Sequence, residues 1–287
     1  MPEYSRVAIV GVGLIGGSIG LALRQRGLAA EVIGIGRRES SLQRATERGA
    51  VDSVTTNLVR GVADSQMVVV ATPVESIADV ALAALQAAPK AIVTDAGSVK
   101  APICRQLREA FVDARPAAGD LRQFIGSHPL AGGHRTGPEH AREDLLCGRV
   151  AVVTPEDDHL PAVAQRLDEF WQSLGAEVVR LSPEEHDRAL AATSHLPHVV
   201  AAALSGCTPE EWLQLAASGW ADTTRIAAAD PGLWLQIFRQ NRAAVLDALT
   251  RFEHQLTALH QALRTGDDQQ LSSILNEAKR MRDALGD

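Results

Sequence analysis

Residues 7–23 read VAIVGVGLIGGSIGLAL. A run rich in Val and Ile, typical of a buried strand, leads directly into Gly11-x-Gly13-x-x-Gly16 at the start of a helical pattern. In such a unit the first glycine allows the tight turn, the second lets a pyrophosphate approach the backbone, and the third lets helix and strand pack closely. The alternative, glycines that serve only a turn, does not explain their place between strand and helix. We expect the cofactor to contact Gly11, Gly13, Leu14, Ile15 and Gly16.

Short apolar runs alternate with helix-length segments up to about residue 181. The segment 98–111 is helical in pattern, because its apolar residues recur every four positions along one face. Strands that alternate with helices pair in parallel. The sequence therefore predicts an α/β fold, a Rossmann-type doubly wound parallel sheet, in an NAD(P)-binding domain over residues 1–181. The strand-like runs are 6–11, 31–36, 67–72, 91–95, 123–127, 149–154 and 177–182.

Strand patterns stop after residue 181, and we expect an all-helical substrate and dimerisation domain over residues 182–287. Two apolar seams there have the spacing of packed helices. They could form an internal core, or they could form the interface of a homodimer, since a helical domain of this size has little area to bury them. The first seam contains Val245, Leu249, Phe252, Leu256, Leu259 and Leu263, and the second contains Leu271, Ile274, Ala278, Met281 and Leu285.

The composition excludes several classes of partner. The formal net charge is −7, so the basic face expected of a protein that binds nucleic acid or an anionic membrane is missing. No apolar run reaches the length of a membrane span, and no signal-peptide pattern precedes the first strand. Cys104, Cys147 and Cys207 are far apart and odd in number, which is typical of reduced thiols. We expect a cytoplasmic protein.

The end of the second strand indicates which dinucleotide is bound. An NAD site usually has Asp or Glu there to hold the ribose 2′-hydroxyl, whereas this chain has Gly36 followed by Arg37 and Arg38. Guanidinium groups suit a 2′-phosphate. The two arginines could instead be solvated residues at the start of a helix. We expect NADP as the cofactor, with NAD as the alternative.

Three further segments follow strands and should lie at the cofactor. Thr72 and Pro73 follow the third run, and Ser98 follows the fourth within DAGSVK. The fifth run leads into GSHPLAGGH (126–134), where His128 can accept a proton, since the ordinary pKa of an imidazole is about 6.5. A histidine in a loop is more often structural, but its place at a strand end beside the nicotinamide favours a catalytic role.

GSHPLAG, DAGSVK, TSHLPH (193–198) and DTTRIAAADPGLW (222–234), in this order behind the glycine motif, resemble the prephenate/arogenate dehydrogenase family of tyrosine biosynthesis. The resemblance covers nearly the whole chain. It implies a Rossmann domain joined to a helical dimerisation domain, and a small-molecule substrate, prephenate or arogenate. It also implies that the substrate's ring alcohol is oxidised by NAD(P)+ with loss of CO2 and aromatisation.

The resemblance also implies roles for individual residues. His128 matches the histidine that bonds the substrate hydroxyl, and Ser98 matches a serine beside it. Arg225 matches an arginine that binds a substrate carboxylate, and an always-charged guanidinium suits that role. The histidines His195 and His198 are three residues apart, so both can face one side of a helical turn. Together with Trp234, an aromatic residue of the pocket wall that can come from the partner subunit, they match substrate-binding positions.

The chain departs from the family pattern at two places. Family members often have Ser/Thr-Glu-Lys after HPxAG, where this chain has Gly133-His134-Arg135, and a position that can be lysine is Ala221. A pocket closed by an ion network through those residues is therefore not expected. His128, His134 and His140 lack an acid or cysteine to complete a metal shell, so no metal is expected. The GIGRRES segment resembles NADP-using arogenate enzymes, whereas the second histidine of SHLPH resembles prephenate enzymes.

Two other classes of protein share parts of this pattern. A 3-hydroxyacid or 6-phosphogluconate type of dehydrogenase needs a catalytic lysine in its first helical segment, and residues 183–206 contain none. A non-catalytic NADP(H) sensor would bind the cofactor without turnover, but it does not explain why His128, Ser98 and Arg225 occur together.

Overall fold

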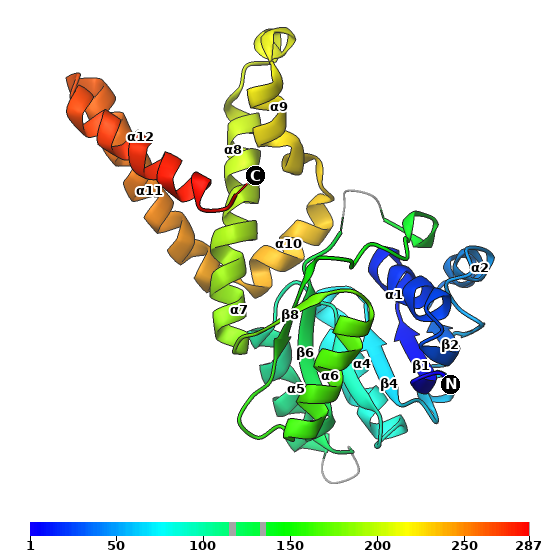
Figure 1. Cartoon of the computed structure of the whole chain (residues 1–287). Coiled ribbons are helices and arrows are strands. Elements are labelled where there is room, and N and C mark those ends of the chain that lie inside the picture. Colours follow the sequence, from blue (N-terminus) through cyan, green and yellow to red (C-terminus); the bar gives the residue numbers. More distant parts are fainter. Residues whose placement is uncertain (115–118, 133–135, 287) are drawn as a thin grey trace.

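The computed structural model describes residues 1–114, 119–132 and 136–286. Its N-terminal part is a single eight-stranded sheet covered by helices, and helical arms project from one end of it (Figure 1). The strand order is β3-β2-β1-β4-β5-β6-β7-β8. The strands are β1 (Tyr4–Val10), β2 (Ala29–Ile35), β3 (Ser53–Thr55), β4 (Met67–Val70), β5 (Ile92–Asp95), β6 (Phe124–Pro129), β7 (Val150–Thr154) and β8 (Glu177–Arg180).

The predicted α/β sheet is confirmed, with two differences. All of the predicted strand-like runs form strands, but β3, a three-residue edge strand, was not expected from the sequence. The pairs from β3 to β6 are parallel, whereas β6 pairs with β7 antiparallel, and β7 and β8 are parallel to each other. An uninterrupted parallel sheet is therefore wrong at this edge. The described part of the β6–β7 connection has only the short helix η4 (Pro138–His140), whereas a parallel crossover usually runs through an α-helix.

Helices cover both faces of the sheet and bury its Val- and Ile-rich strands. One core cluster joins the sheet to α1 and α6 through Ile19, Leu167 and Trp171, and the other joins it to α4 and α5 through Leu85 and Leu107. Both faces are thus apolar, which explains why the strands read as continuous apolar runs. The helices are α1 (Leu14–Gln25), α2 (Glu39–Glu47), α3 (Leu58–Val62), α4 (Ile77–Ala87), α5 (Ala101–Ala114) and α6 (Pro161–Ser173).

The remaining chain is helical, as predicted. A near-continuous rod runs through α7 (Pro183–Leu190), the π-helical turn η5 (Ala191–His195) and α8 (Leu196–Cys207). Pro197 lies just after the π turn, and proline cannot donate to the carbonyl four residues earlier, which accounts for the wider turn. The other helices are η6 (Glu210–Leu215), α9 (Ser218–Thr224), η7 (Arg225–Ala228), α10 (Pro231–Gln240), α11 (Arg242–Thr265) and α12 (Asp268–Asp283).

The two apolar seams lie on α11 and α12, which form a hairpin that projects away from the sheet (Figure 1). Val245, near the base of α11, is buried, but Leu256 is 53% exposed and Leu263 is 67% exposed. The seams are therefore not an internal core within the described chain. No helix in the described part of the chain is long and apolar enough to cross a membrane.

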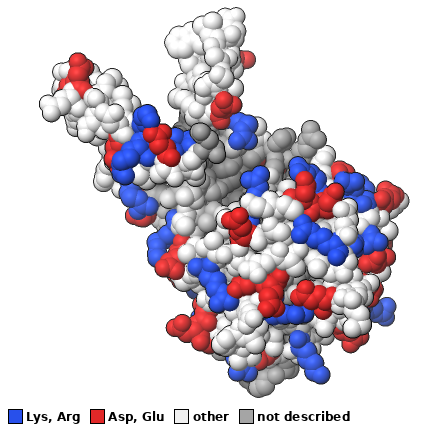
Figure 2. Space-filling model, viewed as in Figure 1, with Lys and Arg blue, Asp and Glu red and all other residues white. Residues whose placement is uncertain are grey.

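Charged residues of both signs are interspersed over the α/β part, and the arm that ends near α9 is largely uncharged in the same view (Figure 2). The exposed apolar side chains of that arm include Trp212, Leu213 and Leu215, on η6.

Candidate functional site

The glycine motif forms the tight turn between β1 and α1. Gly11 has a φ of +98°, and a Cβ there would overlap the carbonyl oxygen of Ala71, so the turn requires glycine. A Cβ at Gly16 would likewise overlap the Gly11 carbonyl oxygen. By contrast, a Cβ at Gly13 would meet no atom of the described residues within 4 Å, and none of their side chains caps the N-terminus of α1. This end of α1 is open to a phosphate, which would bind its free N–H groups.

The arginine pair lies at the end of β2, next to this turn. Gly11 N donates to the carbonyl oxygen of Ile35, the last residue of β2, at 2.8 Å, which holds the two strand ends together. Arg37 and Arg38 are exposed, and neither forms an ion pair with any residue that the structure describes. Two guanidinium groups are therefore available where the 2′-position of a bound ribose would lie.

Thr72, Pro73 and Ser98 follow strands β4 and β5, which pair side by side. Thr72 Oγ1 accepts a hydrogen bond from Ser76 Oγ at 3.1 Å, Pro73 is exposed and Ser98 is half-buried. Both loops thus lie at the carboxyl edge of the sheet, where ligands bind in doubly wound folds.

A buried carboxylate, Asp95, fixes the loop that carries Ser98. Its Oδ2 accepts from Gly97 N at 2.8 Å and forms an ion pair with Lys100 Nζ, and its Oδ1 accepts from Ser127 N at 3.2 Å. Lys100 is fully buried. Through its contact with Ser127 N, Asp95 therefore binds the DAGSVK loop to β6, one residue before His128. The sequence prediction missed Lys100, although it lies inside a motif that had been singled out.

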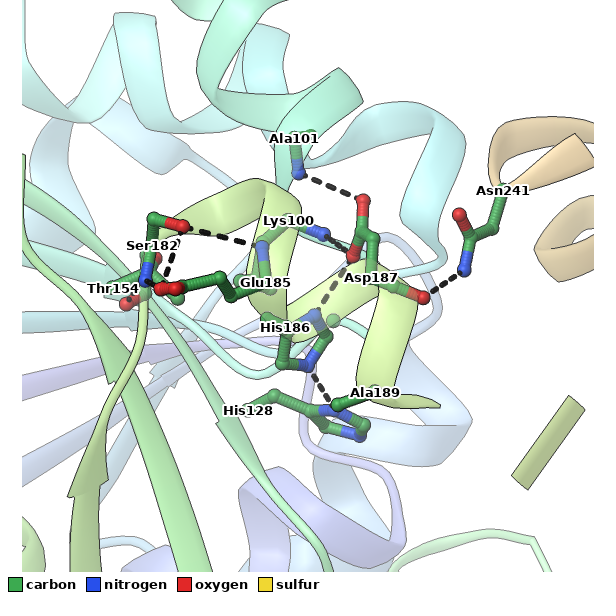
Figure 3. A network of polar contacts seen from close by, with 12 residues as sticks. Lys100, Ala101, His128, Thr154, Ser182, Glu185, His186, Asp187, Ala189 and Asn241 are labelled. Carbon is green, nitrogen blue, oxygen red and sulfur yellow. Dashed lines mark hydrogen bonds and ion pairs between the residues drawn. The ribbon is translucent and has the colours of Figure 1, made fainter. Parts of the chain in front are cut away.

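His128 begins a chain of hydrogen bonds that the sequence prediction also missed (Figure 3). Its Nδ1 lies 2.9 Å from His186 Nε2, and His186 Nδ1 lies 2.7 Å from Asp187 Oδ1. The Asp187 carboxylate also accepts from the backbone N–H groups of Lys100 and Ala101, at 2.7 and 3.0 Å. His186 and Asp187 both belong to the SPEEHD segment, and His186 is 58 residues from His128 in the sequence.

The start of α7 explains the position of His186. Ser182 and Glu185 form a capping box, in which Ser182 Oγ accepts from Glu185 N and Glu185 Oε2 accepts from Ser182 N. Pro183 occupies the first turn. This cap fixes where the helix begins, and so directs the next side chain, His186, into the interior.

The chain of hydrogen bonds assigns a tautomer to each ring. A carboxylate only accepts, so His186 Nδ1 must carry its proton and donate to Asp187. In a neutral His186 the Nε2 atom then accepts, and His128 Nδ1 must donate to it. The proton-free nitrogen of His128 is therefore Nε2, which forms no hydrogen bond with a residue that the structure describes.

Burial and charge keep these histidines neutral. Burial lowers the pKa of His128 well below 6.5, and the neighbouring His186 and Lys100 lower it further. Burial also lowers the pKa of His186, although its hydrogen bond to Asp187 opposes that change. At neutral pH a larger fraction of His128 is therefore unprotonated, and able to act as a base, than of an exposed imidazole, whose pKa is close to neutrality.

His195 and His198 face the same aromatic ring, as their spacing predicts. His198 stacks on Trp234 with ring centroids 3.3 Å apart, and His195 approaches Trp234 edge-on at 6.0 Å. Burial lowers the pKa of each histidine to about 4. Trp234 comes from α10, which contacts the segment just after Pro73. Trp234 thus packs against the two histidines of its own chain.

The structure does not bring Arg225 into this cluster. Arg225 begins η7, is exposed and has no ion-pair partner among the described residues. Ala221 is exposed on α9. Gly133, His134 and Arg135 lie outside the described residues, and His140 is on η4. Among residues 1–114, 119–132 and 136–286, no three metal-ligating side chains form a group.

Two family models match the chain. One is described as the nucleotide-binding domain of prephenate dehydrogenase and matches residues 19–180; the other is its dimerization domain and matches residues 182–277. The prephenate dehydrogenase of Bacillus subtilis is 30% identical, over 97% of this chain and 76% of its own length. The cyclohexadienyl dehydrogenase of Zymomonas mobilis is 31% identical, over 99% and 97%.

Solved structures give the same similarity in three dimensions. The prephenate dehydrogenase from A. aeolicus, in complex with hydroxyphenyl propionate and NAD+, is 30% identical, with a TM-score of 0.88 over 98% of both chains. The Synechocystis arogenate dehydrogenase is 29% identical, with a TM-score of 0.81 over 98% of this chain and 99% of that one.

Proposed function

This chain belongs to the prephenate dehydrogenase family, and we propose that it catalyses the oxidative decarboxylation of prephenate or arogenate, with NADP+ as the hydride acceptor. The observation that supports this most directly is the His128–His186–Asp187 chain, which leaves a proton-free Nε2 at the carboxyl edge of the dinucleotide-binding sheet. The product would be 4-hydroxyphenylpyruvate from prephenate or tyrosine from arogenate.

The residues around the first turn fit a nicotinamide dinucleotide. Gly13 has open space on its side-chain side, and the N-terminus of α1 has no side-chain cap, so Gly11, Gly13, Leu14, Ile15 and Gly16 would hold the pyrophosphate. Thr72 and Pro73 would lie beside the nicotinamide, which supplies the hydride acceptor when bound. Arg37 and Arg38 are exposed and form no ion pair with the residues that the structure describes, which supports NADP over NAD.

His128 would act as the base. As the hydride passes from the ring carbon to NADP+, the hydroxyl group on that carbon would give its proton to His128 Nε2, and a carbonyl would form. The Nδ1–H bond to His186 holds the imidazole in this orientation and stabilises the positive charge that develops on it. Ser98, at the end of the neighbouring strand, would hydrogen-bond the same hydroxyl.

Loss of CO2 needs no further base. When the ring carbonyl has formed, the electrons of the carbon–carboxylate bond would flow into it, CO2 would leave, and the ring would become an aromatic phenolate that takes the proton back from His128. The protein must instead hold the substrate, and Trp234 with His195 and His198 would form the wall beside the ring. Arg225, which is exposed at the start of η7, would bind a substrate carboxylate.

The domain boundaries and the assembly belong to the same proposal. Residues 1–181 would form the dinucleotide-binding domain and residues 182–287 the substrate and dimerisation domain. Exposed leucines on α11 and α12 support a homodimer, because their burial against a second copy removes apolar surface from water.

The direct test is to incubate the purified protein with prephenate and with arogenate, each with NAD+ and with NADP+, and to follow absorbance at 340 nm. We expect turnover of at least one substrate and a higher kcat/KM for NADP+. Cofactor binding without turnover of either substrate would instead identify a non-catalytic NADP(H) sensor.

A further inference from the structure

A buried asparagine joins the two histidine systems of the site. Asn241 lies between α10 and α11 and is 5% exposed. Its Nδ2 is 2.8 Å from the carbonyl oxygen of Asp187 and 3.1 Å from His195 Nδ1 (Figure 3 shows the first contact). Neither the glycine motif nor the histidine motifs of the sequence pointed to this residue.

The two contacts fix the orientation of the amide. A backbone carbonyl oxygen can only accept, so the atom of Asn241 that faces Asp187 must be the NH2 group and not its oxygen. One amide hydrogen then points to Asp187 and the other to His195 Nδ1. A protonated Nδ1 would set two donors against each other. His195 Nδ1 must therefore accept, and a neutral His195 carries its proton on Nε2.

We propose that Asn241 is a positioning residue that holds His195 in its Nε2–H tautomer, so that His195 presents a hydrogen-bond donor to a carboxylate or carbonyl oxygen of the substrate. This inference rests on the proposed function for its substrate. His195 is 1% exposed, its ring lies at 78° to that of Trp234, and its Nε2 forms no hydrogen bond within the described parts of the chain.

Asp187 thereby gives the Nε2 atoms of His128 and His195 opposite roles in hydrogen bonding. Its carboxylate makes His186 a donor, which leaves His128 Nε2 as an acceptor. Its backbone carbonyl orients Asn241, which leaves His195 Nε2 as a donor. The site thus offers an acceptor for the hydroxyl of the substrate and a donor for an oxygen that carries no proton. A substrate with both an alcohol and an oxygen acceptor matches this pair.

The tautomer can be measured without any substrate. In protein labelled with 15N-histidine, a long-range 1H–15N correlation spectrum distinguishes the two neutral forms, and His195→Gln identifies the signal. We expect the Nε2–H pattern for His195 from pH 6 to 8, in keeping with its lowered pKa of about 4. An Nδ1–H pattern or a protonated ring would overturn the inference.

Asn241→Asp replaces the NH2 group by an acceptor of the same shape, which should move the His195 proton to Nδ1. We expect KM to rise by about ten- to a hundredfold, the loss of one hydrogen bond to a charged group, with kcat within about threefold. The matched control is Asn276→Asp on α12, an exposed asparagine, for which we expect no change. A wild-type KM and an unchanged tautomer in Asn241→Asp would contradict the proposal.

A second pair of variants remains informative if Asn241→Asp does not fold. The amide of glutamine can place an N–H near the position of Nε2, whereas asparagine reaches only the position of Nδ1. We expect His195→Asn to raise KM about tenfold or more above the KM of His195→Gln, because only glutamine keeps a donor near the position of Nε2. Equal KM values would overturn the inference. An inactive wild-type enzyme with an Nε2–H tautomer would instead refute the proposed function alone.

Discussion

His128 Nδ1 lies 2.9 Å from His186 Nε2, a contact between the last residues of a sheet strand and the first helix of the helical part. The proposed base is therefore oriented by a residue from a different part of the chain. The two parts must pack together before His128 has its proton on the correct nitrogen.

This relationship predicts different outcomes for two substitutions of His186. Glutamine can still place an accepting oxygen near Nε2, whereas leucine removes the acceptor. We expect kcat to stay within about tenfold of wild type in His186→Gln and to fall by about ten- to a thousandfold in His186→Leu, because a misoriented imidazole is a poor base. Steady-state kinetics decide this, with thermal unfolding as the control for folding. Equal kcat values would show that His186 only packs against His128.

The exposed arginines after β2 predict cofactor preference. Replacing both Arg37 and Arg38 by alanine should lower kcat/KM for NADP+ by about ten- to a hundredfold and leave kcat/KM for NAD+ nearly unchanged, because only the 2′-phosphate loses its partners. Arg122→Ala, before the amino end of β6, is the control. If the double variant keeps the wild-type ratio of kcat/KM for NADP+ to kcat/KM for NAD+, the arginines do not contact the cofactor.

Arg225 is exposed and unpaired within the described chain, as expected of a residue that waits for an anionic substrate. Arg225→Ala should raise KM about tenfold or more with little change in kcat, because a carboxylate contact acts in the ground and transition states alike. Arg225→Lys should have an intermediate KM, since it keeps the charge but not the bidentate geometry. A normal KM with slow turnover would refute this role.

The exposed seam on α11 predicts a dimer, and one charged residue introduced into the seam should weaken its association. Light scattering should show twice the chain mass for wild type, and Leu256→Asp should raise the dimer dissociation constant by at least about tenfold, since the charge would be buried in an apolar interface. Val112→Asp, at a more exposed position on α5, should leave the dimer dissociation constant unchanged. A stable and active wild-type monomer would refute the assembly.

The strands were predictable because each is a Val- and Ile-rich run bounded by a turn. The reversal at β7 was not, because the segment between β6 and β7 is long enough for a parallel crossover and gives no local signal of strand direction. The three residues of β3 pair with β2 at the sheet edge and are too few to show a period.

The site was predictable only where a motif marks it. His128 and Ser98 follow strands, and His195 and His198 are close together in sequence. His186, Asp187 and Asn241 matter through contacts across 46 to 87 residues, and such contacts leave no periodic pattern. For His186 and Asp187, the one local signal in the sequence was the capping box directly before them.

The pH dependence of kcat, in wild type and in His128→Asn, tests the central claim most directly. Burial and neighbouring charges lower the pKa of His128, so its basic form persists as the pH falls through 6.5, and wild-type kcat should decline only at lower pH. His128→Asn should lose that acid limb and about two to four orders of magnitude in kcat, with KM within a few-fold of wild type. A His128→Asn variant that turns over near the wild-type rate, with the acid limb intact, would show that another group is the base.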